Sequence, residues 1–568
     1  MINQKSSQLQ EQVSLNRRGF IKGLTAVSLF LNLLFRFKNT QASVASVGTP
    51  ELSGTEFKLT IAQTEVNFSG RSRLATTVNG SLPAPTLRWR EGDTVTLHVT
   101  NLLQEESSIH WHGIILPFEM DGVPGISFEG IAPGATFVYQ FKVSQAGTYW
   151  YHAHSGMQEQ TGLYGAIVIE PIIPDEHQAK RDYVVMLSDW TDDDPLQVFA
   201  NLKKQSDYYN FNQLTVVDFL RDWYQDGFWA SVSKRQMWNE MRMNMTDLGD
   251  ISAYTYHYLL NGKIAQNSWT GLFQLGEPVR LRFINASAQT FFDVRIPGLK
   301  LQIIAADGQA IQPVWVDEFR IGLAENYDVL IFPKEQAYSI FAQSMDRTGF
   351  TCGTLAIAQG LRAPIPAVDK PEPLSMIDMM GAMTHGEHHD QSGAQHRVRH
   401  ASSEFSASVD MRVDNPRTNL DDPGVGLRNN GRRVLTYADL HSCQPPVGLR
   451  APDRELELHL TGNMERYSWS LDGLEFGDST PVHFRLGEWL RVVLVNDTMM
   501  THPMHLHGMW CDLENSEGEF QVRKHTIVVQ PAQRISFRVQ VDAPGRWAWH
   551  CHLFYHMHAG MMREVVVA

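Results

Sequence analysis

The chain has 568 residues, of which 43% are hydrophobic, 10% aromatic and 19% charged. This composition excludes a disordered chain, and the length predicts two to four domains. The formal net charge of −14 argues against nucleic acid as the main partner, and four cysteines are too few for a disulfide scaffold. Two metal-binding residue types are abundant instead, with 23 His and 22 Met.

The first 45 residues are typical of an export signal. Arg17 and Arg18 precede an apolar run at 24–35, which is too short to span a bilayer, and small residues follow at 42–46. We therefore predict a twin-arginine signal at 1–45, cleaved near Ala42 or Ala45, and a periplasmic protein. An uncleaved signal anchor is the alternative. No other stretch of the sequence is long and apolar enough to cross a membrane.

Most of the remaining sequence alternates between polar and apolar residues in short segments bounded by turns. This period of two is typical of strands in β-sandwiches, and it is clear at 94–100, 279–284 and 490–495. Each of these segments follows a similar glycine-containing turn. We therefore predict an all-β fold built from three repeats, at 46–171, 172–360 and 434–568.

Histidine pairs recur at one position of this repeat. His110 and His112 lie 18 and 20 residues after the turn glycine Gly92. The third repeat has a His-x-His pair at the same offsets, at 505–507, whereas the middle repeat has apolar residues there, beginning with Val294. The first and third repeats are thus expected to supply metal ligands, and the middle repeat none.

Two segments interrupt the strand pattern. Residues 216–248 are rich in Trp, Phe, Met and charge without alternation, which predicts a helical insertion. Residues 361–433 combine Pro, Gly and charge with clustered His and Met, which predicts a long, partly disordered His/Met-rich linker.

Four His-x-His pairs are the strongest chemical signal. On a strand, residues i and i+2 point to the same face, so each pair directs two imidazoles to one place. A single pair is more often structural, but four pairs at matched places in duplicated domains predict a small metal cluster. Its eight candidate ligands are His110, His112, His152, His154, His505, His507, His550 and His552.

Cys551 indicates which metal is involved. One thiolate, two imidazoles and a weak axial thioether form the ligand set of blue-copper electron-transfer sites. His502 and His556 are the remaining imidazole candidates, and Met561 is the thioether candidate. A lone cysteine is more often a buried apolar residue, but histidines flank this one on both sides.

These motifs, HxHG, HxH, HPxHxHG and HCHxxxHxxxGM, resemble those of the multicopper oxidases across nearly the whole mature chain. More narrowly, the leader and the Met-rich stretch at 242–247 resemble the copper-resistance protein A branch. The resemblance implies three cupredoxin-like Greek-key domains and four coppers. It implies type 1 ligands His502, Cys551, His556 and Met561, type 2 ligands His110 and His505, and type 3 ligands His112, His152, His154, His507, His550 and His552.

The resemblance also implies a reaction. Four one-electron substrate oxidations would be coupled to reduction of O₂ to two waters, with electrons passing from Cys551 to its neighbouring histidines. Asp121 matches an acid near the cluster, as a proton donor or a group that orients ligands; an ordinary Asp-Gly turn is the alternative. Some relatives place a carboxylate after the last type 1 histidine, where this chain has Met557 and His558.

Thioethers prefer Cu(I), and methionines cluster in both interrupting segments. They could capture Cu(I) for a cuprous oxidase in copper resistance, supplied by periplasmic copper carriers. The alternatives are core packing, a solvated linker, a laccase-like phenol oxidase, or a copper-sequestering protein. The candidate Cu(I) ligands are Met237, Met241, Met243, Met245, Met376, Met379, Met380, Met383, His385, His388 and His389.

The other three cysteines are Cys352, Cys443 and Cys511. A disulfide among them is compatible with an oxidising compartment, but the sequence does not select partners. Cys443 is also a candidate free copper-binding thiol.

Overall fold

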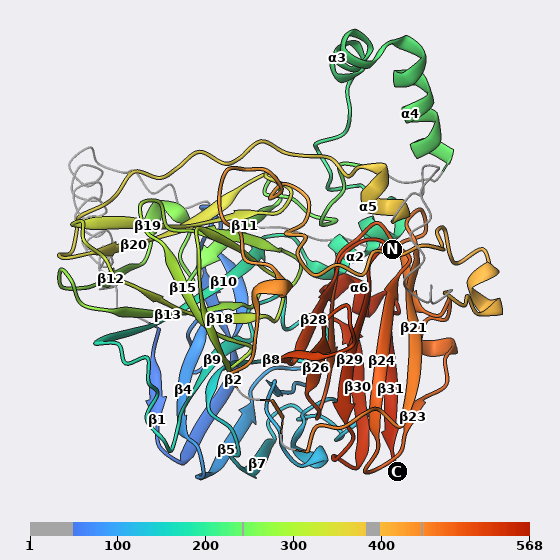
Figure 1. The fold of residues 1–568 in the computed structure, drawn as a ribbon. Coiled ribbons are helices and arrows are strands. Elements are labelled where there is room, and N and C mark those ends of the chain that lie inside the picture. The colour runs from blue at the N-terminus through green and yellow to red at the C-terminus, as the bar shows by residue number, and fades with distance from the viewer. Residues whose placement is uncertain (1–48, 241–243, 382–397, 444, 447) are drawn as a thin grey trace, which may run out of the picture. The chain divides into compact units, whose positions relative to one another are not determined.

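Among the residues that the computed structural model describes, which are 49–240, 244–381, 398–443, 445–446 and 448–568, the strands form six sheets. These sheets fall into three pairs, and each pair is built from one stretch of the chain. Figure 1 shows the first pair in blue, the second in green and yellow, and the third in orange and red. The predicted all-β fold is confirmed. The signal at 1–45 lies outside the described residues.

The first pair of sheets has the strand orders β1-β4-β9-β8-β6 and β3-β2-β5-β7. Alternate residues of β5 are buried, as its period of two predicts. The strands are β1 (Glu51–Ser53), β2 (Glu56–Val66), β3 (Arg73–Val78), β4 (Ala84–Arg90), β5 (Thr94–Asn101), β6 (His110–His112), β7 (Thr136–Lys142), β8 (Gly147–His152) and β9 (Tyr164–Glu170).

The second pair has the orders β11-β10-β13-β18-β15-β16 and β12-β20-β19-β14-β17. Val294 and Ile296, at the offsets that carry histidines elsewhere, are buried in its core. The strands are β10 (Arg181–Thr191), β11 (Tyr256–Leu260), β12 (Thr270–Leu272), β13 (Val279–Asn285), β14 (Phe292–Arg295), β15 (Leu301–Ala306), β16 (Gln309–Val316), β17 (Glu318–Ile321), β18 (Asn326–Ile331), β19 (Ala337–Ser344) and β20 (Phe350–Ala356).

The third pair repeats the orders of the second, as β22-β21-β24-β29-β26-β27 and β23-β31-β30-β25-β28. The strands are β21 (Arg454–Asn463), β22 (Ser468–Leu471), β23 (Val482–Phe484), β24 (Trp489–Asn496), β25 (His502–Leu506), β26 (Cys511–Glu514), β27 (Phe520–Lys524), β28 (Thr526–Val529), β29 (Arg534–Gln540), β30 (Gly545–Cys551) and β31 (Met562–Val567).

The helices lie mainly in the connections. The expected helical insertion contains α3 (Val216–Asp226) and α4 (Phe228–Glu240), which project beyond the sheets in Figure 1. A capping box of Thr215 and Asp218 begins α3, and Gly227, with φ of 92°, separates the two helices. The remaining helices are α2 (Pro195–Lys204), α5 (Met376–Met380) and α6 (Phe554–His558). None of the described helices is both long and apolar enough to cross a bilayer.

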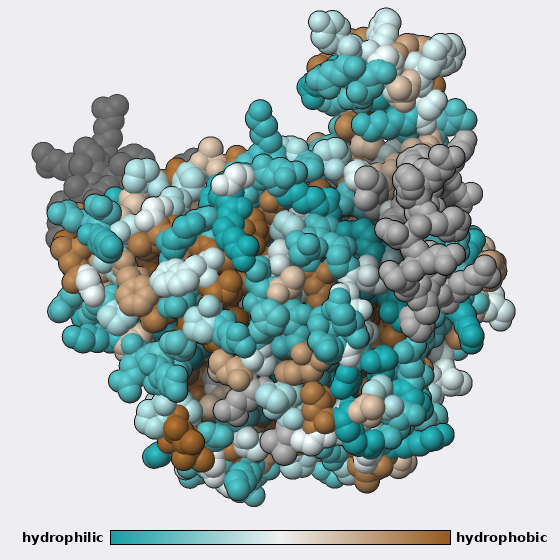
Figure 2. Space-filling view, in the orientation of Figure 1, coloured by the Kyte–Doolittle hydropathy of each residue, from teal (hydrophilic) through white to brown (hydrophobic). Residues whose placement is uncertain are grey.

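The predicted linker at 361–433 is better packed than its composition suggests. Arg432 forms an ion pair with Glu318 at 2.6 Å and another with Asp369. Arg417 pairs with Gln533 as an isolated β-bridge. The described parts of this segment, 361–381 and 398–433, pack against the domains through such ion pairs and through buried apolar residues such as Leu374 and Val413. The expected partial disorder stays a prediction, since 382–397 lie outside the described residues. Figure 2 shows a mainly hydrophilic surface with scattered hydrophobic patches.

All four cysteines are free, so the structure contains no disulfide among them. Cys352 and Cys511 are buried, whereas Cys443 is exposed.

Candidate metal centre

The histidine pairs lie at equivalent places in the first and third pairs of sheets. In the first, β6 pairs with β8 so that His110 lies opposite His152. In the third, β25 pairs with β30 so that His505 lies opposite His550. Each of these two domains therefore carries four of the imidazoles, and they come from two neighbouring strands and the residues that follow them.

The two halves interleave to form one cluster. The ring of His110 stacks on that of His507 with centroids 4.0 Å apart, and His112 stacks on His505 at 3.8 Å. His154 contacts His550 with centroids 5.1 Å apart. All eight predicted cluster histidines take part in such contacts, and all but the partly buried His154 are buried.

The nitrogen atoms of the cluster fit a bound metal. Four of the histidines use Nδ1 to donate a hydrogen bond to a backbone carbonyl, at 2.6–3.1 Å, which leaves the lone pair on Nε2. His507 and His550 face each other through Nε2 at 3.1 Å. The remaining inward nitrogens are buried without a hydrogen-bond partner, and they are Nε2 of His110, His152, His154, His505 and His552 and Nδ1 of His112.

Low pKa values of the cluster histidines also favour metal binding. Burial lowers the pKa of His154 well below its usual value, and the neighbouring imidazoles His550 and His110 lower it further. Burial likewise lowers the pKa of His550, to about 4. Neutral imidazole is the form that binds metals, so the cluster is ready to receive cations at neutral pH.

Asp121 connects the two halves of the cluster. Its Oδ2 accepts a hydrogen bond from His507 Nδ1 at 2.9 Å, and its backbone oxygen accepts one from His110 Nδ1 at 2.8 Å. The following Gly122 has φ of 82°, and a Cβ atom there would lie 1.9 Å from the oxygen of Ile109. The Asp-Gly turn is therefore present, and it positions the carboxylate against ligand candidates from both domains.

Glu159 is a second buried acid at the cluster, and sequence reasoning missed it. Its Oε2 lies 2.7 Å from His152 Nδ1, and its Oε1 lies 3.9 Å from His552 Nδ1. Burial, with the charge of Asp189, raises its pKa well above the usual value. Its place seven residues after His152 gave no local signal.

His525 is a ninth histidine at the cluster, also missed. Its Nδ1 lies 3.2 Å from His112 Nε2, and its backbone oxygen accepts from His505. The adjacent Lys524 is fully buried and forms ion pairs with Asp307 at 2.9 Å and Glu325 at 3.0 Å. The second repeat therefore supplies carboxylates that hold the third repeat beside the cluster.

The residues predicted for a blue-copper site also meet. His502 Nδ1 lies 3.5 Å from Cys551 Sγ and 3.3 Å from His556 Nδ1. The other ring nitrogen of His502, Nε2, is 2.7 Å from Thr498 Oγ1. The Nδ1 atoms of His502 and His556 are therefore the ring nitrogens directed at the thiol. Met561 is buried, and its backbone bonds to both Cys551 and His556.

Asp250 is a further residue that sequence reasoning missed. Its Oδ2 accepts a hydrogen bond from His556 Nε2 at 2.7 Å, and also bonds to Gln289 at 2.6 Å and Tyr467 at 3.1 Å. The Asp250 backbone N–H donates to Asp247 Oδ1 at 3.1 Å. Asp250 therefore contacts the predicted thiolate site through its carboxylate and the end of the Met-rich stretch through its backbone N–H.

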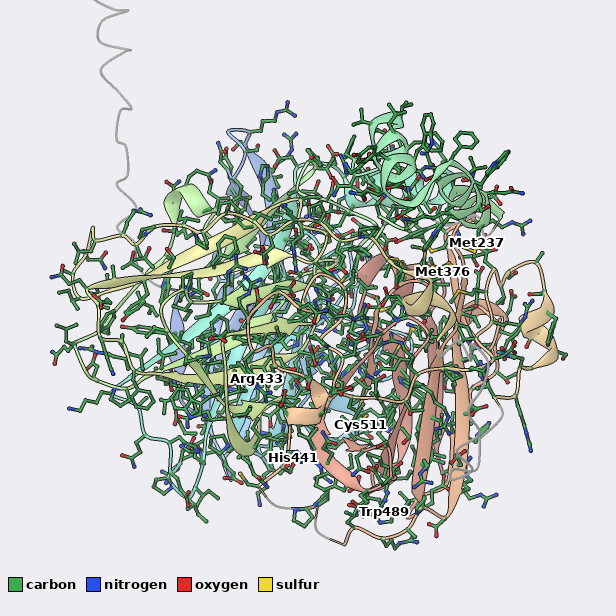
Figure 3. All side chains as sticks on the ribbon, turned by 45° about the horizontal axis from the view of Figure 1, so that its top comes forward. Met237, Met376, Arg433, His441, Trp489 and Cys511 are labelled. Carbon is green, nitrogen blue, oxygen red and sulfur yellow. The ribbon has the colours of Figure 1, made fainter. Side chains whose placement is uncertain are left out.

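The methionine candidates divide into two groups. Met245 and Met379 are buried in the hydrophobic core, which supports packing for these two, and Met245 O accepts from Leu374 N at 2.8 Å. Met237 on α4 and Met376 on α5, both labelled in Figure 3, are only partly buried. The side chain of Met380 lies outside the described residues, as do Met241, Met243, Met383, His385, His388 and His389.

Comparison with known proteins agrees with this geometry. Three multicopper oxidase family models match the chain, at residues 60–172, 181–359 and 450–568. Copper resistance protein A of Escherichia coli is 52% identical, over 97% of this chain and 99% of its own length. A copper resistance protein A homolog of Pseudomonas syringae pv. tomato is also 52% identical, with the same coverage.

Solved structures share the fold at lower identity. Fet3p, a multicopper oxidase that functions in iron import, is 18% identical with a TM-score of 0.64, covering 91% of this chain and 90% of its own. A laccase from Botrytis aclada is 20% identical with a TM-score of 0.61, covering 92% and 88%. From the matched models and the close relatives, the chain belongs to the multicopper oxidase family, copper-dependent oxidases that use four coppers and reduce O₂ to water.

Proposed function

We propose that this oxidase acts on Cu(I), and that the twelve predicted ligands divide as the family motifs imply. His502, Cys551, His556 and Met561 would form the type 1 site. His110 and His505 would hold the type 2 copper, and the other six cluster histidines the type 3 pair. The convergence of free, neutral imidazole nitrogens in one cluster, and of Cys551 with two Nδ1 atoms in another, supports this division.

The chain's own residues would connect the type 1 site to the histidine cluster and supply protons to the cluster. When bound, the coppers accept electrons singly from the substrate and supply four of them to O₂, which leaves as two waters. Cys551 lies between His550 and His552, so covalent bonds join the two centres by the shortest path that the chain allows. Asp121 holds the outer nitrogen of His507 and Glu159 that of His152, so both acids are placed to donate protons to the cluster.

The bond between Asp250 and His556 is the observation that favours Cu(I). The Asp250 carboxylate accepts from the outer nitrogen of His556, and the Asp250 backbone N–H donates to Asp247, the last residue of the Met-rich stretch. A carboxylate behind a ligand of the proposed type 1 site would favour a cationic substrate, because negative charge stabilises the Cu(II) product. Met237 and Met376 are the described candidate methionines that keep exposed surface.

The same surroundings disfavour a phenol. One face of the His556 ring is covered by Trp469, with centroids 3.8 Å apart, and Asp250 occupies its outer nitrogen. All three strong ligands of the proposed type 1 site are buried, with at most 1% of their surface exposed. An aromatic substrate could therefore not bind against the ring of His556.

We further propose that the protein works in the periplasm after twin-arginine export, and that copper carriers deliver Cu(I) to it. The paired arginines at 17–18 support the export route. The names of the close relatives, copper resistance protein A and its homolog, support a role in removing Cu(I).

Oxygen uptake by the copper-loaded mature protein tests the substrate. Cu(I) and a phenol are compared as sole reductants, in the wild type and in Asp250→Asn. We expect faster uptake with Cu(I), and a larger loss of Cu(I) turnover than of phenol turnover in the variant. Asp226→Asn, an exposed change on α3, is the matched control. Faster uptake with phenol would contradict the proposal, and copper binding well above four per chain with little turnover would favour sequestration.

A further inference from the structure

Two histidines and two carboxylates meet in the third repeat, away from the cluster described above. His459 lies on β21, and Asp497 follows β24 directly. His400 and Glu404 come from the linker segment 398–414, which packs on these strands: Asp410 N donates to Gly462 O at 2.9 Å. Nothing in the oxidase reaction uses these four side chains.

Their donor atoms form a closed ring. Starting from Glu404 Oε2, the next atom is His400 Nδ1 at 2.7 Å, followed by Asp497 Oδ2 at a further 3.5 Å. His459 Nδ1 lies 2.6 Å from Asp497 Oδ2 and 3.4 Å from Glu404 Oε2, which closes the ring. Two nitrogens and two oxygens therefore alternate around one point.

The surroundings orient all four groups toward that point. The outer oxygen of each carboxylate is held by a backbone N–H: Ala401 donates to Glu404 Oε1 and Val413 to Asp497 Oδ1, both at 2.8 Å. The outer nitrogens of the imidazoles each face a carboxylate, with His459 Nε2 3.5 Å from Glu457. His400 Nε2 likewise lies 3.6 Å from Asp414. Carboxylates behind imidazoles are the usual support of histidines that bind a metal.

The charge balance also requires positive charge at this point, from the imidazoles themselves or from a bound metal. Glu404 and Asp497 have no exposed surface, and within the described residues neither carboxylate has an ion pair with Lys or Arg. Two buried carboxylates without such a partner are costly unless the imidazoles are charged or a metal is bound.

We propose that His400, Glu404, His459 and Asp497 form a further metal site that binds Cu(II). Two imidazoles and two carboxylates are a borderline-hard donor set, which suits Cu(II) and not the Cu(I) that thioethers prefer. Among divalent metals such a set binds copper most tightly. A divalent cation would neutralise both carboxylates and leave the imidazoles uncharged.

This site would fasten the linker beside the proposed type 1 centre. Thr498, which follows Asp497, contacts His502 through its hydroxyl at 2.7 Å. His400 and Glu404 both belong to the linker, so metal binding would join segment 398–414 to the strands that precede His502. The Cu(II) that the oxidase produces would supply this site, and to that extent the inference rests on the proposed function.

Copper content tests the site directly. The full-length mature protein, the linker variants His400→Gln and Glu404→Gln, and the control Glu455→Gln, at an exposed position of β21 that the site does not use, are equilibrated with Cu(II) and freed of loosely bound metal. The copper content per chain is then measured, and Cu(II) is quantified by integrating the electron paramagnetic resonance spectrum. We expect the two linker variants to lose one copper and one spectroscopic signal per chain. They should keep the blue absorption of the type 1 site, which reports that they are folded. Glu455→Gln should match the wild type.

Three results would overturn the proposal. The first is equal copper content in all four proteins, which would show that the imidazoles are simply protonated partners of the carboxylates. The second is the same loss in Glu455→Gln as in the linker variants. The third is occupation of the site by Zn(II) when equal concentrations of Zn(II) and Cu(II) compete. These outcomes do not depend on whether the enzyme oxidises Cu(I) or a phenol.

Discussion

Asp121 and His507 are 386 residues apart in the chain, yet Asp121 Oδ2 and His507 Nδ1 form a buried hydrogen bond of 2.9 Å. The backbone oxygen of the same aspartate accepts from His110. One turn of the first repeat therefore sets the orientation of imidazoles from both halves of the cluster. The cluster is assembled only when the first and third repeats are docked.

Changing Asp121 should weaken the cluster without affecting the type 1 site. Groups that orient metal-binding histidines are commonly worth about 10–100-fold in metal affinity or activity. We expect Asp121→Ala to lower O₂ uptake by about that factor and to retain the blue absorption. Asp121→Asn, which keeps an oxygen to accept from His507, should retain more copper than Asp121→Ala. Equal copper loss in both variants would contradict an orienting role.

Glu159 should be needed where it contacts His152 and His552. Its carboxylate contacts His152 at 2.7 Å, so Glu159→Leu leaves that Nδ1 without an acceptor side chain. We expect O₂ uptake to fall about 10–100-fold while type 1 reduction by substrate stays fast, as measured by stopped-flow bleaching of the blue absorption. Bleaching that slows as much as O₂ uptake would place the role of Glu159 elsewhere.

Lys524 should make a large contribution to stability. Its ammonium is fully buried between Asp307 and Glu325, so Lys524→Met would leave two buried carboxylates without that charge. Breaking a buried pair in this way costs about 3–5 kcal/mol, which urea unfolding can measure. Arg433→Met, which removes a largely exposed ion pair with Asp439, should cost at most about 1 kcal/mol. Similar costs for the two variants would contradict this account.

The linker should loosen in acid. Burial by itself would raise the pKa of Asp422, but hydrogen bonds from Arg428 and Gly424 N–H and the charges of Arg428 and Arg417 lower it to about 2. A lowered pKa stabilises the fold above the unfolded value of about 4, and this stabilisation is lost as the pH falls toward 2. The free energy of unfolding of Asp422→Asn should therefore be below that of wild type at pH 6. The two should converge near pH 2, and a constant difference between them would contradict this explanation.

The ligand candidates could be predicted because they repeat locally. A His-x-His pair on a strand directs both rings to one face, and the shared offsets from Gly92 and Gly487 revealed the duplication. The strands at 94–100, 279–284 and 490–495 were predictable for the same reason, since alternation is a local pattern that a half-buried sheet requires.

The residues that support the ligands could not be predicted in this way. Glu159, Asp250 and His525 reach the site only through tertiary contacts, and no motif marks them. The packing of the described linker residues could not be predicted, because it comes from tertiary contacts such as the ion pair of Arg432 with Glu318, 114 residues apart, and from buried residues such as Val413. From amino-acid composition alone, such charged residues are expected to lie on the solvated surface.

The electron balance of the reaction is the most direct test of the central claim, a four-copper oxidase that consumes Cu(I). Cu(I) consumption and O₂ consumption would be measured together in the copper-loaded wild type, with catalase added at the end to detect peroxide. Four Cu(I) oxidised per O₂, with no O₂ returned by catalase, is the result that this account predicts. Two Cu(I) per O₂, with half of the O₂ returned, would mean that the electrons are not collected in one cluster and would contradict it.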